Sequence, residues 1–452
     1  MKDQQRVEAK GQEVLFERRR NEIPDAERVT ILQGKLYQKA KQEKGYKFYV
    51  LYDKLTIPYM LRQAWKSVKE NKGSAGIDGK SIADIEQYGV EKYLDELSEE
   101  LRKQTYKPQA VKRVMIPKAN GGERPLGIPT VKDRIAQTVC KMVLEPIFEA
   151  DFEECSHGFR PGRSSKDAMA SVKEYLKEGK TEILDADLSK YFDTIPHDKL
   201  MIAIKERVSD PRILKLILSW LKTPVFEDRQ FKGGKKNNLG TPQGGVISPL
   251  LANLYMHLLD RILSKAQSLF DQYGVKIVRY ADDFVLMGSE IPDIVLDKLK
   301  RLLDRMGLML NEQKTKLINA KTTSFDFLGF TVRYSKSLFD NGHFWNISPS
   351  KKAENKIREK FREYLRTHGH CGPQQIASDL NAIIRGWLNY FDINGVSYTK
   401  LSKIRMRLYL YFKLLRYYNR KSQRRSRLYR HNAYEVLIRK HGLIDPMKYS
   451  PH

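Results

Sequence analysis

The chain has 452 residues, 41% of them hydrophobic, and its 82 Lys and Arg residues against 55 Asp and Glu residues give a net charge of +27. A chain of this length is too long for one ordinary hydrophobic core, and its composition excludes wholesale disorder. We therefore expect two to four packed domains. The positive excess costs self-repulsion in a compact protein and indicates a polyanionic partner, most commonly nucleic acid.

Cysteine usage and hydropathy exclude several other classes of protein. Cys140, Cys155 and Cys371 lie far apart and outside any C-x-x-C pair, which argues against a disulfide framework or a zinc-binding module. The N-terminus has no apolar signal-peptide core, and no run of about 18 apolar residues occurs in the chain. We therefore expect a cytoplasmic protein with no membrane partner.

Helical and extended patterns alternate along the first two-thirds of the chain. Residues 1–54 are polar and predict a helical N-terminal extension with a flexible lead-in. Helical patterns follow over residues 61–73 and 84–104, and residues 106–130 predict a hairpin with basic residues near its tip. Residues 131–152 predict an amphipathic helix. The stretch "TEILDADLSKYFDTI" begins as a strand and then turns to helix.

Further along, a Gly-Pro loop in "LGTPQGGVISPLLANLYMHLLDRIL" opens a long helix, and residues 278–287 read as two short strands meeting at a tight turn. A helix over residues 292–308 and two strands, "KLINA" and "FDFLGFTVRY", come next. Strands that alternate with helices and also pair as a hairpin predict an α+β fold, in which an antiparallel sheet is layered by helices.

From about residue 346 the pattern becomes helical and strongly basic. Residues 401–452 hold 14 Lys or Arg residues against only two acids, Glu435 and Asp445. Trp387, Tyr409, Tyr411, Tyr417 and Tyr418 are threaded through these helices. They could stack on bases, but for most of them a role in the helical core is the better interpretation.

Two adjacent acids, Asp282 and Asp283, lie at the turn of "VRYADDFVLM". Asp is a common turn residue, so taken alone these acids are more often solvated than functional. Metal-assisted phosphoryl transfer, however, needs carboxylates that converge from separate strands. Asp185 and Asp187 are candidates for a third ligand, and because residues two apart in a strand face the same side, spacing alone does not choose between them.

Several ordered motifs resemble those of reverse transcriptases. "DLSKYFD" (187–193), "GTPQGGVISPLLANLYM" (240–256) and "RYADDF" (279–284) resemble motifs A, B and C, and the whole set resembles bacterial group II intron reverse transcriptase/maturases. Further matches are "NKGSAGIDG", "IPKANGGERPLGIPTVKDRIAQ", "SHGFRPGRSS", "NEQKTKL", "FDFLGF" and "IIRGWLNYF". The resemblance covers about residues 55–450.

The resemblance implies a right-hand polymerase. The ranges we expect are 1–54 for the N-terminal helical extension, 55–345 for the fingers and palm, and 346–452 for a basic α-helical thumb/maturase domain. In the family the motif A acid is followed four residues later by an aromatic side chain, which fits Asp187 with Tyr191. Asp187, Asp282 and Asp283 are thus the implied catalytic residues and metal ligands, with two Mg²⁺ ions as cofactor and Mn²⁺ as a substitute.

Four residues are implied in dNTP binding. Lys118 and Arg124 flank a Gly-Gly turn and match the residues that grip the triphosphate. Tyr191 would pack under the sugar and exclude a 2′-hydroxyl, with an ordinary core tyrosine as the alternative. Gln243 would touch template or nucleotide in a loop where Gly244 and Gly245 permit close backbone approach.

Four basic residues are implied in contacts with template or intron RNA. Arg160 and Arg163 lie in a loop suited to the template backbone, and Lys314 in "NEQKTKL" would lie near phosphates. Arg385 belongs to the thumb motif "IIRGWLNYF". A residue without a role in binding is the alternative for Lys314, as a solvated side chain is for Lys118 and Arg124 on their hairpin.

The implied function is an RNA-directed DNA polymerase that binds its group II intron RNA, assists splicing and copies the intron during retrohoming. Its expected partners are the intron RNA, an RNA template, a DNA target or primer and dNTPs, and a homodimer stays open. The chain has no C-terminal Cys/His cluster of a DNA endonuclease, so we expect no second-strand cleavage. The alternatives are an RNA-binding splicing factor without polymerase activity and a domesticated reverse transcriptase in defence, spacer acquisition or DNA repair.

Overall fold

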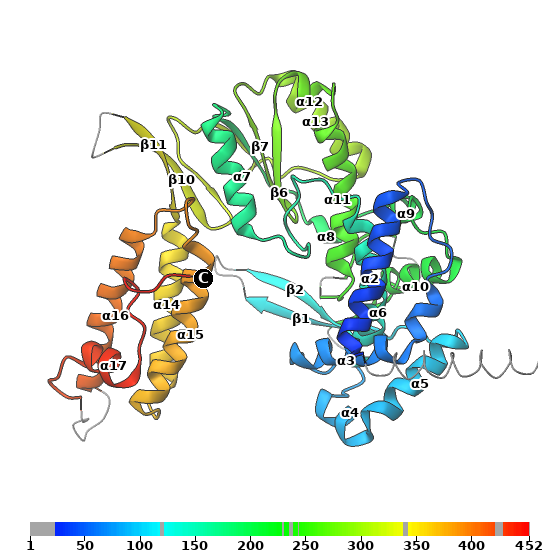
Figure 1. Cartoon of the computed structure of the whole chain (residues 1–452), viewed down its shortest axis with the longest axis horizontal. Helices are drawn as coiled ribbons and strands as arrows, with labels where there is room; N and C mark the ends of the chain where they lie inside the picture. The colour runs from blue at the N-terminus through cyan, green and yellow to red at the C-terminus, as the bar shows by residue number, and fades with distance from the viewer. Residues whose placement is uncertain are drawn as a thin grey trace, which may run out of the picture. The chain divides into compact units, whose positions relative to one another are not determined.

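The computed structural model describes residues 23–117, 122–227, 230–234, 238–242, 244–337, 342–420 and 428–451 (Figure 1). Contacts divide the chain into two compact units. Unit 1 comprises Met1–Arg160, Leu188–Ile262 and Asp297–Leu310, and unit 2 comprises Pro161–Asp187, Leu263–Leu296 and Asn311–His452. This division by contacts differs from the ranges expected from the sequence, and those ranges stay a prediction.

Unit 1 is built around α6 (Val131–Glu149), which is buried along most of its length. Its N-cap Thr130 accepts a hydrogen bond from the Asp133 N–H, which satisfies a donor that the first helical turn leaves open. Helices α2 (Asp25–Gln42) and α3 (Pro58–Glu70) pack against α6. The helix predicted over residues 131–152 is therefore confirmed, but it is central and enclosed rather than amphipathic.

The single helix predicted over residues 84–104 is wrong, because the structure has two helices there. Helix α4 (Ile82–Tyr88) ends at Gly89, and α5 (Val90–Arg102) begins directly after it. Gly89 has φ +106°, a backbone conformation that only glycine adopts without strain. The glycine within the apolar pattern is thus a helix break.

The hairpin predicted over residues 106–130 is confirmed. Strand β1 (Val111–Pro117) pairs antiparallel with β2 (Glu123–Ile128), with Val114 opposite Leu126. Two short strands that the sequence reading missed, β4 (Val225–Glu227) and β5 (Gln230–Lys232), extend this sheet in the order β2-β1-β4-β5. Unit 1 also contains η1 (Tyr52–Thr56), α8 (Tyr191–Thr194), α9 (His197–Lys205), α10 (Pro211–Leu221), most of α11 (Ser248–Ser264) and the larger part of α13 (Asp293–Met306).

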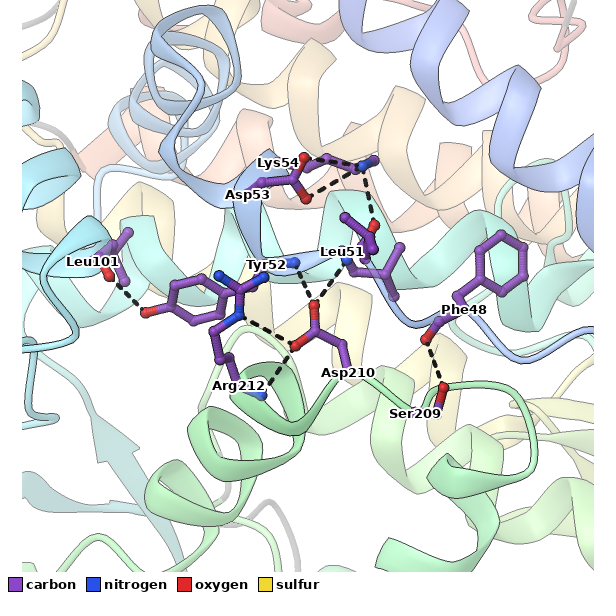
Figure 2. A network of polar contacts seen from close by, with 10 residues as sticks. Phe48, Leu51, Tyr52, Asp53, Lys54, Leu101, Ser209, Asp210 and Arg212 are labelled. Atoms are coloured by element: carbon purple, nitrogen blue, oxygen red, sulfur yellow. Dashed lines mark hydrogen bonds and ion pairs between the residues drawn. The ribbon is translucent and has the colours of Figure 1, made fainter.

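A buried carboxylate, Asp210, joins the segment before α3 to α10 (Figure 2). Its Oδ2 accepts hydrogen bonds from the backbone N–H groups of Leu51 and Tyr52, both at 2.9 Å. Its Oδ1 accepts one from the Arg212 N–H at 3.0 Å, so Asp210 is also the N-cap of α10. Desolvation acts to raise the pKa of Asp210, but these N–H groups and the Arg212 charge outweigh it and hold the pKa below its usual value.

Unit 2 contains a four-stranded antiparallel sheet in the order β6-β7-β3-β8. Its strands are β3 (Glu182–Ala186), β6 (Lys276–Tyr280), β7 (Asp283–Gly288) and β8 (Lys316–Asn319). Helix α7 (Ser165–Lys177) packs against β6 (Figure 1). The α+β prediction of an antiparallel sheet layered by helices is therefore confirmed.

A second, three-stranded sheet in unit 2 has the order β11-β10-β9. The predicted strand "FDFLGFTVRY" is in fact two strands, β9 (Phe325–Phe327) and β10 (Phe330–Lys336), because Leu328 and Gly329 both take positive φ and reverse the chain. Strand β11 (His343–Pro349), which the sequence reading missed, pairs with β10.

Basic helices follow the second sheet: α14 (Lys351–Thr367), α15 (Pro373–Phe391), α16 (Lys400–Arg420) and α17 (Ala433–His441), side by side in Figure 1. Their apolar faces share one hydrophobic core with both sheets of unit 2 and with α7. Trp387 and Tyr418 are buried in that core, and Tyr409, Tyr411 and Tyr417 pack partly buried against it, so these aromatic residues have core positions. Among the described residues, no helix is both long and apolar enough to cross a membrane.

We predict that Asp210→Ala lowers the free energy of unfolding by about 2–4 kcal/mol, because three N–H groups lose their shared acceptor in a buried position. The contribution of Asp210 should be present above the unfolded pKa near 3.9 and lost as pH falls through its lower folded pKa. Urea denaturation from pH 2 to pH 7 measures both.

The matched control is Asp84→Ala, which removes an exposed acid from the capping box of α4 in the same unit. Its cost should be clearly smaller than that of Asp210→Ala, because water can replace the exposed carboxylate. Equal losses for the two variants would contradict the joining role of Asp210.

Candidate active site

Strand pairing brings four carboxylates to one edge of the β6-β7-β3-β8 sheet. Asp185 pairs with Val285 and Ala186 with Phe284, so Asp187, the next residue, leaves β3 beside Asp283, the first residue of β7. Because β6 and β7 form a hairpin in which Tyr280 pairs with Asp283, Asp282 lies in the connecting turn. The strand register thus places these acids near one edge of the sheet, and their role as metal ligands stays a prediction.

Arg279 stabilises the turn that carries Asp282. Ala281 has φ +61°, which is strained for a residue with a side chain. The guanidinium of Arg279, fully buried, donates a hydrogen bond to the Ala281 carbonyl at 2.8 Å. The sequence reading passed over Arg279, although a charged residue within the apolar run of a strand is a signal of this kind.

Lys314 lies against Asp187. Its Nζ is 2.7 Å from Asp187 Oδ2, and the lysine side chain is 68% exposed while that of Asp187 is 31% exposed. The oxygen itself is buried, and no described residue gives it a hydrogen bond of good geometry. The ammonium of Lys314 therefore forms an ion pair with this carboxylate. Lys314, which the sequence predicts near phosphates, lies directly against one of the acids.

Two of these acids, Asp185 and Asp283, have raised pKa values. Desolvation, together with the charges of Asp187 and Asp326, raises the pKa of Asp185 to about 6. Desolvation and the charges of Asp282, Asp187 and Asp185 raise the pKa of Asp283 to about 6. Desolvation and the neighbouring negative charges thus both favour the protonated forms of these two acids.

Tyr191 is buried in unit 1, with 3% of its surface exposed. Its hydroxyl donates a hydrogen bond to the Ala252 carbonyl at 2.5 Å, which ties α8 to α11. The ring therefore has one fixed position, and any contact with a sugar would come from the ring rather than from the hydroxyl.

The other predicted dNTP-binding residues are only partly described. Arg124 lies on β2 opposite Ile116, while Lys118, Gln243 and the side chain of Arg124 lie outside the described part of the structure. Gly244 has φ +107°, and a Cβ there would lie 2.0 Å from the Gly127 carbonyl oxygen. The backbone at Gly244 therefore lies close to β2, and the contact of Gln243 with template or nucleotide stays a prediction.

Comparisons with known proteins agree on one family. Residues 116–332 match the model for reverse transcriptase (RNA-dependent DNA polymerase), and residues 354–432 match the model for the group II intron maturase-specific domain. The protein YkfC of Escherichia coli strain K12 is 32% identical over 72% of this chain and 94% of its own length. The chain belongs to the group II intron reverse transcriptase/maturase family.

Two other relatives are longer than this chain. The group II intron-encoded protein LtrA of Lactococcus lactis subsp. cremoris is 34% identical over 59% of this chain and 42% of its own length. An uncharacterized 91 kDa protein in the cob intron of Schizosaccharomyces pombe is 28% identical over 79% of this chain and 53% of its own length. A chain in a solved partial Cas6-RT-Cas1–Cas2 complex matches 56% of this chain and 42% of its own length, with 22% identity and a TM-score of 0.35.

Membership in the family confirms the expected order of a reverse transcriptase domain followed by a thumb/maturase domain. Reverse transcriptase domains use divalent metal ions. Within the described part of the chain, no three His, Cys, Asp or Glu side chains stand close enough together to hold an ion in their present positions. The residues nevertheless fit such an ion in their chemistry, since hard carboxylate oxygens come from adjacent segments and, among the described residues, an exposed lysine is the side chain that pairs with the buried Asp187 Oδ2.

Arg160, which the resemblance implies in RNA contact, is buried in the structure. Arg160 is 7% exposed, and its guanidinium forms a 2.7 Å ion pair with Glu149. It also donates hydrogen bonds to the Glu153 and Ser156 carbonyls at 2.6 and 2.7 Å. With its donors used inside unit 1, Arg160 supports the loop rather than reaching RNA. Arg163 is half-buried and Arg385 is exposed on α15.

We predict that, with a chelator present, the free energy of unfolding falls between pH 4 and pH 6.5 more steeply in the wild type than in Asp185→Asn. A raised pKa means that the folded protein binds this proton more tightly than the unfolded chain, so stability is lost as pH rises toward 6. Chemical denaturation at a series of pH values measures the slopes, and equal slopes would show that Asp185 titrates normally.

Proposed function

We propose that this protein is an RNA-directed DNA polymerase that binds a group II intron RNA, assists its splicing and copies it during retrohoming. The observation that carries the proposal is the pairing of β3 with β7 and of β7 with β6, which gathers Asp187, Asp282 and Asp283 at one sheet edge. The domain matches support the polymerase and maturase parts, since group II intron maturases and reverse transcriptases bind intron RNA.

Asp187, Asp282 and Asp283 are the proposed ligands of two Mg²⁺ ions, which would lower the pKa of the primer 3′-hydroxyl and stabilise charge on the transferring phosphate. Asp187 and the acids of the turn come from different segments, so they can hold ions from two sides. Arg279 donates a hydrogen bond to the Ala281 carbonyl and so supports the turn that carries Asp282. Asp185, with its pKa raised to about 6, is proposed as a neighbour that holds a proton more readily than an ordinary acid.

Nucleotide selection is proposed for the ring of Tyr191. The hydrogen bond from its hydroxyl to Ala252 holds the ring rigidly, as a steric filter against a 2′-hydroxyl requires. Lys118, Arg124 and Gln243 stay proposed contacts for the triphosphate and for the template or nucleotide.

We predict that Tyr191→Ala incorporates NTPs on a primed RNA template at least about tenfold better than the wild type relative to dNTPs, because the excluding ring is gone. Tyr191→Phe is the control: it keeps the ring and loses only the bond to Ala252, so it should still reject NTPs. Steady-state kcat/KM for dNTPs and NTPs measures both. Loss of discrimination in the Phe variant would assign selection to the hydroxyl instead.

Asp282→Ala should abolish extension in the same assay while leaving the protein folded. If the folded wild type showed no Mg²⁺-dependent extension, the polymerase proposal would fail and an RNA-binding splicing factor would take its place.

RNA binding is proposed for the basic helices of unit 2. Helix α14 exposes Lys351, Lys352, Lys356, Lys360, Arg362 and Arg366. Arg385 is exposed on the neighbouring α15. Such side chains can follow phosphates by releasing counterions.

We predict that Arg385→Gln weakens intron RNA binding several-fold and lowers the slope of log affinity against log salt by roughly 0.7 to 1, since one phosphate contact is lost. Arg160→Gln is the contrast: its side chain is buried, so it should lower the melting temperature and leave the salt slope unchanged. Filter binding across salt concentrations measures the slopes. An unchanged slope for Arg385→Gln would remove it from the RNA surface.

A further inference from the structure

Two lysines of the β8 segment face two aspartates of the β3 segment. Lys316 is the register partner of Asp185 in the β3–β8 pair. Lys314, two residues earlier, places its Nζ 2.7 Å from Asp187 Oδ2. The segment 314–316 therefore places one lysine beside each of two neighbouring carboxylates, Asp185 and Asp187.

The backbone fixes the position of Lys314. The Asn311 N–H donates a hydrogen bond to the Asp187 carbonyl at 2.7 Å, which docks the turn on Asp187 itself. The N–H groups of Lys314 and Thr315 donate to the Asn311 carbonyl at 3.0 and 2.8 Å, which closes the turn. The chain thus returns the Lys314 ammonium to the carboxylate of the residue whose carbonyl anchors the turn.

Lys314 and a divalent ion compete for the same oxygen. A carboxylate oxygen binds Mg²⁺ at about 2.1 Å, so an ion on Asp187 Oδ2 would stand within a few ångströms of the ammonium, and the two positive charges would repel. The lysine side chain is 68% exposed, so it can move into solvent without unpacking anything.

We propose that Lys314 is an exchangeable counter-ion for Asp187: it neutralises the carboxylate until a divalent ion binds, and the ion binds by displacing it. This inference rests on the proposed function, because it takes Asp187 as a metal ligand. It assigns Lys314 a role in setting the metal affinity of the site. Removing the lysine should tighten metal binding and should cost stability only when no metal is bound.

The experiment measures Mn²⁺ binding by the electron paramagnetic resonance signal of free Mn²⁺, using the full chain freed of metal with a chelator. Lys314→Gln should bind Mn²⁺ roughly two- to fivefold more tightly than the wild type, the size expected for losing one exposed ion pair. Its melting temperature should be lower than that of the wild type without metal, and the difference should vanish at saturating Mn²⁺.

Two variants serve as controls. Lys314→Arg keeps the charge and should bind Mn²⁺ as the wild type does. Lys316→Gln removes the same charge two residues away, opposite Asp185 instead of Asp187, and should produce only a small part of the change.

Unchanged Mn²⁺ affinity in Lys314→Gln would overturn the inference, as would equal tightening in Lys316→Gln, which would show a general field effect. Asp187→Asn separates this failure from failure of the proposed function. If Asp187→Asn weakens Mn²⁺ binding while Lys314→Gln leaves it unchanged, only the counter-ion role falls. If Asp187→Asn has no effect, the metal-ligand assignment falls, and the counter-ion role falls with it.

Discussion

The pairing of β3 between β7 and β8 is the constraint on which the candidate site depends. In this register the end of β3 meets the first residue of β7 on one side and the β8 segment on the other. A slip of one residue would turn Asp187 to the opposite face of the sheet, because side chains alternate along a strand. Buried Ile183 and Leu184 on β3 and Val285 and Leu286 on β7 hold the register through their packing.

The same register creates an electrostatic conflict that the surrounding residues only partly relieve. Four acids lie near one edge of the sheet, where desolvation first and the neighbouring negative charges second raise the pKa values of Asp185 and Asp283 to about 6. Lys314 forms an ion pair with Asp187, and the buried Arg279 donates a hydrogen bond to the carbonyl of Ala281 in the strained turn. A cluster of like charges whose repulsion destabilises the folded protein is typical of sites that bind cations.

Much of this could be predicted from the sequence, because the motifs consist of residues whose local chemistry is distinctive. The hairpin around Asp282 follows from apolar runs on both sides of a tight turn. The helix break at Gly89 was missed, because an isolated glycine is tolerated within a helical pattern and only the backbone shows its positive φ. The burial of Arg160 was not, since an arginine in a Gly-Pro loop looks solvated until Glu149 on α6 is placed beside it. The contact of Lys314 with Asp187 joins residues 127 positions apart, and only the docking of the 311–315 turn reveals it.

We propose that Asp187 and the acids of the 281–283 turn form one divalent-metal centre, with Asp185 outside it. The most direct test is anomalous scattering from Mn²⁺ in crystals of the protein with a primer–template and a dNTP. We expect Mn²⁺ bound by Asp187 and Asp282, with the Lys314 ammonium moved away from Asp187. Mn²⁺ bound by Asp185 in place of Asp187, or bound without either acid of the turn, would contradict it.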